Sequence, residues 1–298
     1  MENRLQQYRK GFPAMIACYL IWGFQPLYYT IDTAVDTVFL LACRIVWAAV
    51  ACLVILKVQG KLPQLRAVFR DRAVLRREIP AAVLLLADWG IYLFAVRCGK
   101  VMEAAMGYYI MPLVMFALGA ALFREPFSRR HLLALGFIAV GIVLSTGGFG
   151  GFPYVTVLLA LCFAVYSACK KSLSVDSVVS TTAEILMIVP PALLYLCLFG
   201  RSELLLSALM PGRQLFLIGS GIVTGVPMVL FAVGVRYLPL SLSGIMQYLS
   251  PSLGLLCGVL MGETLSREKL ISFLFIWLGV ILYTVCEWRG TAAGRQRE

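Results

Sequence analysis

Long apolar stretches separated by short polar segments dominate the chain. A helix needs about 20 apolar residues to cross a bilayer, and ten stretches reach or approach that length. Lipid offers no partner for backbone N–H and C=O groups, and the strict alternation typical of a membrane β-barrel is absent, so the stretches are predicted to be helices. The predicted spans are Phe12–Ile31, Val35–Val58, Ile79–Cys98, Glu103–Phe123, Leu132–Thr146, Phe152–Lys170, Val178–Gly200, Leu215–Val235, Leu240–Gly262 and Leu270–Trp288.

The composition agrees with this pattern. Hydrophobic residues make up 61% of the chain and charged residues 14%, whereas a soluble domain carries about 25% charged residues. Such an excess of apolar side chains has to face lipid. The sequence therefore predicts an all-α integral membrane protein with ten transmembrane helices.

The basic residues gather on alternate connections between the spans. If the chain starts in the cytoplasm, nineteen of its 26 Lys and Arg residues fall on the cytoplasmic side, six fall on the opposite side, and Arg44 lies within a span. This bias is typical of the cytoplasmic face of membrane proteins. It predicts a multi-pass protein of the plasma (inner) membrane with both termini cytoplasmic, and it explains the net charge of +11 without a nucleic-acid partner.

One polar segment, residues 61–78, has an amphipathic pattern. Leu62, Leu65, Phe69 and Ala73 recur at helical spacing among six basic residues. The pattern predicts a surface helix that lies against the anionic headgroups of membrane lipids. A role in partner binding or regulation is the alternative interpretation.

The two halves of the chain resemble each other. Residues 96–112 read VRCGKVMEAAMGYYIMP and residues 235–251 read VRYLPLSLSGIMQYLSP, with Val, Arg, Tyr and Pro at matching positions. Upstream, Arg44 falls against Glu184 at a similar offset. Each repeat, 1–147 and 148–298, then holds five spans, and an odd number makes the second repeat enter the membrane from the opposite side. Such inverted repeats are typical of secondary transporters, which expose one midplane site alternately to each side.

Several short motifs together carry a resemblance to a known family. They are Tyr19–Gly23 with Pro26, Arg44–Trp47, Glu103–Ile110 with Pro112, Glu125, Gly221–Thr224 with Val226–Pro227, Gln247–Tyr248 with Pro251, and Gly262–Glu263. On these residues the chain resembles the drug/metabolite transporter superfamily, in its EamA branch and most closely the RarD type of permease, over nearly its whole length. The resemblance implies export or exchange of metabolites or amphipathic drugs. It also implies an amide where this chain has Asp88.

Three ionisable residues lie deep within predicted spans. An arginine at the bilayer centre costs roughly 2.5–3.5 kcal/mol, so such residues usually have a function. Arg44 and Asp88 each lie about 13–14 Å into their spans, close to the midplane. We expect Arg44 and an acid, Asp88 or Glu184, to line a central cavity and bind a charged group of the substrate. A static buried ion pair is the alternative, and proton coupling through Asp88 is a further hypothesis.

Aromatic and amide side chains within the spans form a second group of candidates. Rings with polar tips suit amphipathic organic solutes, although core packing explains them equally well. The predicted cavity residues of this group are Trp22, Trp89, Tyr108, Tyr109, Tyr166, Tyr248, Gln25 and Gln247. Glu103, near the start of a span, is predicted either to bind substrate or to stabilise a helix N-terminus.

Helix breaks, gates and close helix contacts are also predicted. Prolines interrupt backbone hydrogen bonding, and the freed carbonyls are tolerated where they line a cavity. The helix-break and gating candidates are Pro26, Pro112, Pro227, Pro251, Glu125 and Glu263. Glycines spaced four apart, Gly221 with Gly225 and Gly254 with Gly258, favour close helix packing.

These patterns favour a secondary transporter, an exporter or exchanger, of small metabolites or amphipathic drug-like organic solutes. Its predicted mechanism is alternating access around a midplane cavity. An integral-membrane enzyme acting on a lipid or isoprenoid substrate is the alternative, but it would need clustered acids, histidines or a metal, and the chain has one histidine, His131. We expect no catalytic residue, cofactor or metal. The sequence leaves open a proton as coupling ion and a homodimer.

Overall fold

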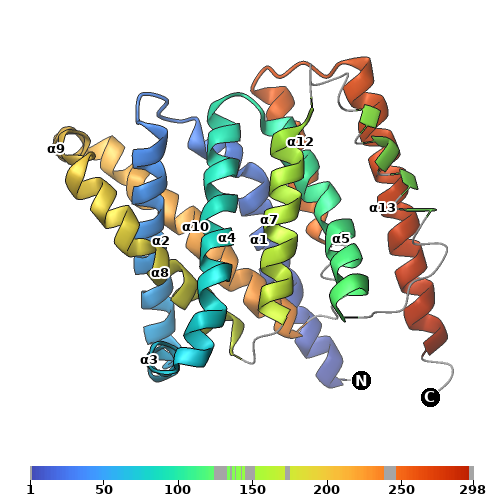
Figure 1. Cartoon of the computed structure of the whole chain (residues 1–298), viewed down its shortest axis with the longest axis horizontal. Helices are drawn as coiled ribbons and strands as arrows, with labels where there is room; N and C mark the ends of the chain where they lie inside the picture. Colours follow the sequence, from blue (N-terminus) through green and yellow to red (C-terminus); the bar gives the residue numbers. More distant parts are fainter. Residues whose placement is uncertain are drawn as a thin grey trace.

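The structure is a bundle of α-helices (Figure 1). The computed structural model describes residues 2–123, 133–134, 136–137, 139–141, 143–144, 152–171, 175–237 and 246–294, and over these residues it contains helices and no strand. The helices are α1 (Glu2–Tyr29), α2 (Thr37–Val58), α3 (Leu62–Arg70), α4 (Arg72–Arg97), α5 (Val101–Phe123), α7 (Tyr154–Lys171), α8 (Ser177–Leu198), α9 (Arg201–Ala208), α10 (Pro211–Tyr237), α12 (Leu249–Leu260) and α13 (Arg267–Gly294).

Four helices are long and apolar enough to cross a membrane. Over the described residues these stretches are Thr37–Val58, Arg72–Arg97, Val178–Leu198 and Pro211–Phe231, in α2, α4, α8 and α10. The fold is therefore that of an all-helical membrane protein, as the hydrophobic pattern predicted. The predicted fifth span, Leu132–Thr146, is described only in part, so the total of ten spans stays a prediction.

The expected surface helix is shorter than its amphipathic pattern suggested. It ends at Arg70, and Arg72 begins the long helix α4. The cause is Asp71, whose carboxylate accepts the N–H groups of Ala73 and Val74 and so caps the start of α4. The basic residues that follow Asp71 thus extend α4 instead of α3.

An ion pair holds the start of α3 near the start of α8. Lys61 Nζ lies 2.8 Å from Asp176 Oδ2, and Asp176 Oδ1 accepts the N–H groups of Val178 and Val179. Partial burial raises the pKa of Asp176, whereas the hydrogen bonds from Lys61 and from these two N–H groups lower it. The hydrogen bonds together outweigh the burial, so the pKa lies below its ordinary 3.8. Asp176 therefore favours the folded state in its charged form.

Replacing Asp176 with asparagine keeps a helix cap and removes the charge. A lowered carboxylate pKa gives stability that is present above the ordinary pKa and is lost as the pH falls through the folded-state pKa. We expect D176N to lower the free energy of unfolding at pH 7 by no more than about 1 kcal/mol for this partly exposed pair, seen as a lower thermal midpoint, and we expect this difference from the parent to shrink as the pH falls through the folded-state pKa of Asp176. Adding K61Q should then have little further effect; full additivity of the two substitutions would contradict the pairing.

The end of the bundle where α1 joins α2 collects several helix ends. Arg97, the last residue of α4, donates to the carbonyl of Tyr29, the last residue of α1. Asp32, which follows α1, pairs with Arg213 in the first turn of α10. The Tyr195 hydroxyl, close to the end of α8, donates to Asp36, which caps the start of α2. We call this the clasp end of the bundle.

The remaining contacts at the clasp end set the directions of α5, α7 and α12. Glu263, just after α12, accepts the N–H of Val101 at the start of α5, and Glu103 accepts the N–H of Val155 at the start of α7. Helices α1, α4, α8 and α12 thus run toward the clasp end, whereas α2, α5, α7 and α10 run away from it. Helix α1 begins and α13 ends at the opposite end (Figure 1).

Glycines bring α10 against α2. A Cβ atom on Gly221 would lie 2.3 Å from Trp47 Cβ and 2.4 Å from the Trp47 carbonyl carbon, which no side chain tolerates. One turn later, a Cβ atom on Gly225 would lie 3.3 Å from the Ala48 carbonyl oxygen. The spacing of these glycines therefore places two backbones in direct contact, as expected for small residues between membrane helices.

Candidate functional site

Arg44 is buried at the centre of the bundle. It lies on α2, its side chain is 3% exposed, and its guanidinium carbon lies 5.0 Å from the ring centre of Tyr29 and 4.7 Å from that of Trp89. The Arg44 Nε donates to Thr224 Oγ1 on α10, at 2.7 Å. Aromatic faces and one hydroxyl thus offset part of the cost of burying the charge.

Two polar atoms at this site have no hydrogen-bond partner in the part of the protein that the structure describes. Among the described residues, Arg44 Nη1 and Asp88 Oδ1 are buried and make no hydrogen bond, and Arg44 forms no ion pair. Asp88 is 3% exposed, and its Oδ2 accepts the Tyr108 hydroxyl at 3.3 Å. An unpaired buried polar atom costs about 1–3 kcal/mol, and more when charged. The static ion pair that we considered for Arg44 is therefore not formed in this conformation.

Thr224 organises the site and was not predicted as a site residue. Its hydroxyl donates to the Ser220 carbonyl at 2.8 Å, accepts from Arg44, and lies 3.0 Å from the Tyr29 hydroxyl. Because its one proton is used by Ser220, Tyr29 is the donor to Thr224. A threonine in an apolar helix usually bonds only to its own backbone, so the sequence gives no sign of this role.

Tyr29 and Tyr92 complete the aromatic wall of the site. The two rings lie 6.4 Å apart, and the ring of Tyr92 lies 5.9 Å from that of Tyr108. Sequence reasoning found Trp89 and Tyr108 but missed these two. The side chains of these three tyrosines and of Trp89 surround the region of Arg44 and Asp88. We define the central site as Tyr29, Arg44, Asp88, Trp89, Tyr92, Tyr108 and Thr224.

Glu184 belongs to a different cluster. Its Oε2 accepts the Tyr166 hydroxyl at 2.9 Å, and its Oε1 lies 3.4 Å from Ser180 Oγ. The same Ser180 hydroxyl lies 2.8 Å from Glu78, which is also fully buried. Glu184 and Tyr166 therefore lie together near the start of α8, and of the two acids considered beside Arg44 only Asp88 is in the central site.

Trp22, Tyr109, Tyr248 and Gln247 lie outside the central site as well. The Trp22 ring lies 5.8 Å from Phe231, and Tyr109 stacks on Tyr248 at 6.2 Å. Gln247 lies 3.8 Å from the Met111 sulfur. The sequence pattern identified all four as aromatic or polar residues within spans, but depth along a helix does not say which way a side chain points.

Gln25 supports the backbone of α10. Its Nε2 donates to the Val223 carbonyl oxygen at 3.1 Å. In a regular helix that carbonyl would accept the N–H of residue 227, but Pro227 has none. A buried glutamine thus replaces the hydrogen bond that the proline removes, one residue before Thr224.

Replacing Gln25 with leucine should leave the Val223 carbonyl unpaired. We expect a loss of about 1–3 kcal/mol of stability, seen as a lower unfolding midpoint in detergent. Q247L should cost less, because within the described part of the chain the Gln247 amide donates only to a sulfur atom. Adding P227A to Q25L returns an N–H to Val223 and should recover part of the loss; no recovery would show that Gln25 acts otherwise.

Three of the four candidate prolines do not break their helices, which corrects the prediction for these three. Helices α1, α5 and α10 continue through Pro26, Pro112 and Pro227, whereas Pro251 lies in the first turn of α12, which begins at Leu249. A proline inside a helix removes one backbone hydrogen bond, and the helix persists because the surrounding apolar phase penalises every further unpaired group. At Pro227, the hydrogen bond from Gln25 to the Val223 carbonyl replaces the backbone hydrogen bond that the proline removes.

Two of the candidate glutamates, Glu103 and Glu263, cap neighbouring helices. Glu103 Oε1 accepts the Val155 N–H at the start of α7, at 3.0 Å. Glu263 accepts the N–H groups of Val101 and Met102 at the start of α5; burial raises the pKa of Glu263, although these two hydrogen bonds oppose the shift. A carboxylate at a helix N-terminus was one of our interpretations of Glu103, and the helix it caps is not its own. Glu125 lies outside the described residues.

An apolar helical bundle with a charged, partly unpaired centre defines a multi-pass membrane protein with a buried polar site. A model of the EamA-like transporter family matches the chain twice, over residues 9–147 and 153–285. The chain belongs to the EamA-like transporter family.

Individual relatives match along almost the full length. The chain is 35% identical to the uncharacterized transporter YojE of Bacillus subtilis, over 93% of this chain and 94% of the relative. It is 29% identical to protein RarD of Escherichia coli, over 94% and 95%, and 26% identical to the chloramphenicol-sensitive protein RarD of Pseudomonas aeruginosa, over 92% and 93%. A solved crystal structure that is 20% identical matches 95% of this chain and 98% of its own with a TM-score of 0.62, which shows a shared fold.

Proposed function

We propose that the protein is a secondary transporter, an exporter or exchanger, of small metabolites or amphipathic drug-like organic solutes, and that the solute binds at the central site. The observation that carries this proposal is Arg44, a buried guanidinium whose Nη1 has no partner among the described residues. Burial of such a group is costly unless a ligand uses it. An anionic or strongly polar group of the solute would accept from Nη1.

The rest of the central site suits the same solute. The rings of Tyr29 and Trp89 offer aromatic surface beside Arg44, and Asp88 Oδ1 is available to accept a hydrogen bond from the solute. Arg44 and Asp88 are each 3% exposed, so the site is closed to both ends in this conformation. A solute can therefore enter or leave only when helices move, as alternating access requires.

We further propose that residues 1–147 and 148–298 are inverted five-helix repeats. The family model matches two consecutive segments. Helices that correspond in the internal repeat, α1 with α7, α2 with α8, α4 with α10 and α5 with α12, run in opposite directions relative to the clasp end. With the basic residues on the cytoplasmic side, both termini lie in the cytoplasm and the clasp end faces outward.

Helix α3 supports a contact with lipid headgroups. Leu65 and Val68 are buried, whereas Arg66 and Arg70 are exposed. A helix that buries its apolar face and exposes arginines at a bundle end is suited to anionic headgroups.

Transport by the purified protein tests the proposal. Proteoliposomes would be loaded with an extract of uniformly ¹³C-labelled small metabolites, with chloramphenicol added because one relative is named for it, and the external medium would be read by mass spectrometry. We expect one or a few solutes to leave chemically unchanged, with saturation and stimulation by the same solute outside. No movement, or a chemically altered product, would contradict transport, and the second outcome would favour the enzyme alternative. Repeating the assay with an imposed pH gradient tests proton coupling.

A further inference from the structure

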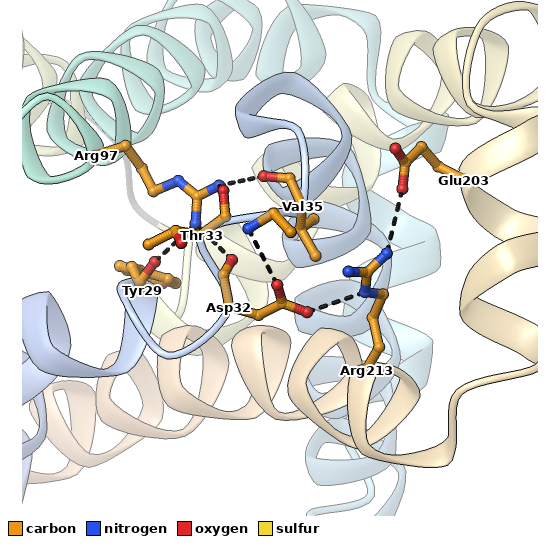
Figure 2. Close-up of polar contacts among 8 residues, drawn as sticks. Tyr29, Asp32, Thr33, Val35, Arg97, Glu203 and Arg213 are labelled. Atoms are coloured by element: carbon orange, nitrogen blue, oxygen red, sulfur yellow. Dashed lines mark hydrogen bonds and ion pairs between the residues drawn. The ribbon is translucent and has the colours of Figure 1, made fainter.

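A polar network closes the clasp end of the bundle (Figure 2). The guanidinium of Arg97 donates to four backbone carbonyls of the segment that joins α1 to α2: Nη1 lies 3.2 Å from the Tyr29 oxygen and 2.7 Å from that of Asp32, and Nη2 contacts those of Thr33 and Val35. One side chain from α4 thus fixes the conformation of this whole connection.

The same connection is tied to the second half of the chain. Asp32 Oδ1 accepts the Ala34 N–H at 3.1 Å, and Asp32 Oδ2 accepts from Arg213 Nε at 2.9 Å. Arg213 Nη1 lies 3.8 Å from Glu203 Oε2 on α9. Arg97 binds the connection from α4, in the first half of the chain, whereas the pair of Asp32 with Arg213 links the connection to α10, in the second half.

The strength of this link suits a contact that forms and breaks. The side chains of Asp32 and Arg213 are 24% and 11% exposed, so water reaches the pair. Partly exposed ion pairs contribute little to stability, whereas a fully buried pair would be hard to separate. A pair of this strength can form in one arrangement of the halves and separate in another at little energetic cost.

Tyr29 connects the clasp end to the central site. Its carbonyl oxygen accepts from Arg97, its ring lies against the Arg44 guanidinium, and its hydroxyl donates to Thr224. Tyr29 is fully buried. A solute that draws Arg44 away from the Tyr29 ring would therefore also displace the carbonyl on which Arg97 is anchored.

From this geometry we infer that the Asp32–Arg213 ion pair is the closing contact of the transporter at the clasp end, and that Tyr29 is the positioning residue that couples this contact to occupancy of the central site. The inference rests on the proposed function. It names three residues that sequence reasoning did not select, because charges and a tyrosine near a span end are expected at any membrane surface.

A cysteine introduced at position 220, between the clasp end and Thr224, would report opening of the bundle at the clasp end. Ser220 is fully buried on α10, its hydroxyl bonds within its own helix, and cysteine is close to it in size. In a cysteine-free background, the S220C thiol would be labelled with a membrane-impermeant reagent from the clasp side. We expect D32N and R213Q each to speed labelling about two- to fivefold, since they remove one partly exposed ion pair. The exchanged pair D32R/R213D should return the rate toward the parent value.

Two controls separate this device from a general effect of charge or folding. R201Q removes an exposed charge on α9 that has no partner among the described residues, and it should leave the rate unchanged. Y29L keeps the carbonyl but removes the ring beside Arg44 and the hydroxyl that bonds Thr224, so the transported solute should no longer alter the labelling rate. Y29F, which keeps the ring and the carbonyl, should retain a solute response. Unchanged labelling in both D32N and R213Q, or a solute response in Y29L equal to that of the parent, would overturn the inference. If the parent protein moves no solute, the proposed function itself fails, whatever the labelling shows.

Discussion

Replacing Arg44 with glutamine should reduce solute exchange by about 10- to 150-fold, because a hydrogen bond to a charged group contributes roughly 1.5–3 kcal/mol. The exchange rate of R44K should lie between those of the parent and R44Q, since an ammonium keeps the charge but not the planar set of donors. Exchange of the labelled solute in proteoliposomes measures the effect, and R201Q is the matched surface control.

The stability of the Arg44 variant separates a binding role from a structural one. Removing one member of a buried ion pair costs about 3–5 kcal/mol, because it leaves the other charge unpaired. In this structure Arg44 has no paired carboxylate among the described residues, so R44Q should lose transport and keep most of its unfolding midpoint. Wild-type exchange in R44Q, or loss of fold together with transport, would contradict a solute-binding role.

Replacing Gly221 with alanine should destabilise the protein by about 3 kcal/mol or more. The added Cβ would lie 2.4 Å from the backbone carbonyl carbon of Trp47, and backbone atoms cannot move aside as a flexible side chain does. Overpacking usually costs 1–3 kcal/mol, and this contact is more severe than most. The unfolding midpoint in detergent measures the loss.

Gly212 on the same helix is the matched control. It is exposed, and an added Cβ would meet nothing within 4 Å. G212A should therefore be neutral or slightly stabilising, because alanine loses less backbone entropy than glycine in a helix. Equal midpoints for G221A and G212A would contradict direct backbone contact between α2 and α10.

The hydrophobic pattern predicted the helical fold well because burial in lipid leaves the backbone few alternatives. It predicted α2 to within two residues at its start. It placed the boundary between α3 and α4 wrongly, because the amphipathic period continues across Asp71 and only the cap separates the helices. The helix α9 was not expected, since eight residues without a long apolar run give no periodic signal.

The sequence predicted the candidate site in part. The cost of burying charge singled out Arg44 and Asp88, and both lie in the central site. The same argument chose Glu184, yet its partners are Tyr166 and Ser180, because depth in the membrane fixes one coordinate of a residue and not its direction. Thr224 and Tyr29 act through contacts across about 195 residues of sequence, which no local pattern reveals.

Two-sided labelling of one central cysteine tests alternating access most directly. Tyr92 suits this purpose because its ring lies beside Tyr29 and Tyr108 and its hydroxyl makes no hydrogen bond within the described part of the chain. In a cysteine-free background that still exchanges the labelled solute, a membrane-impermeant thiol reagent should modify Y92C from either side of oriented vesicles, and the transported solute should slow both reactions. Modification from one side only, or from neither side while surface cysteines react, would contradict a single central site that opens to each face in turn.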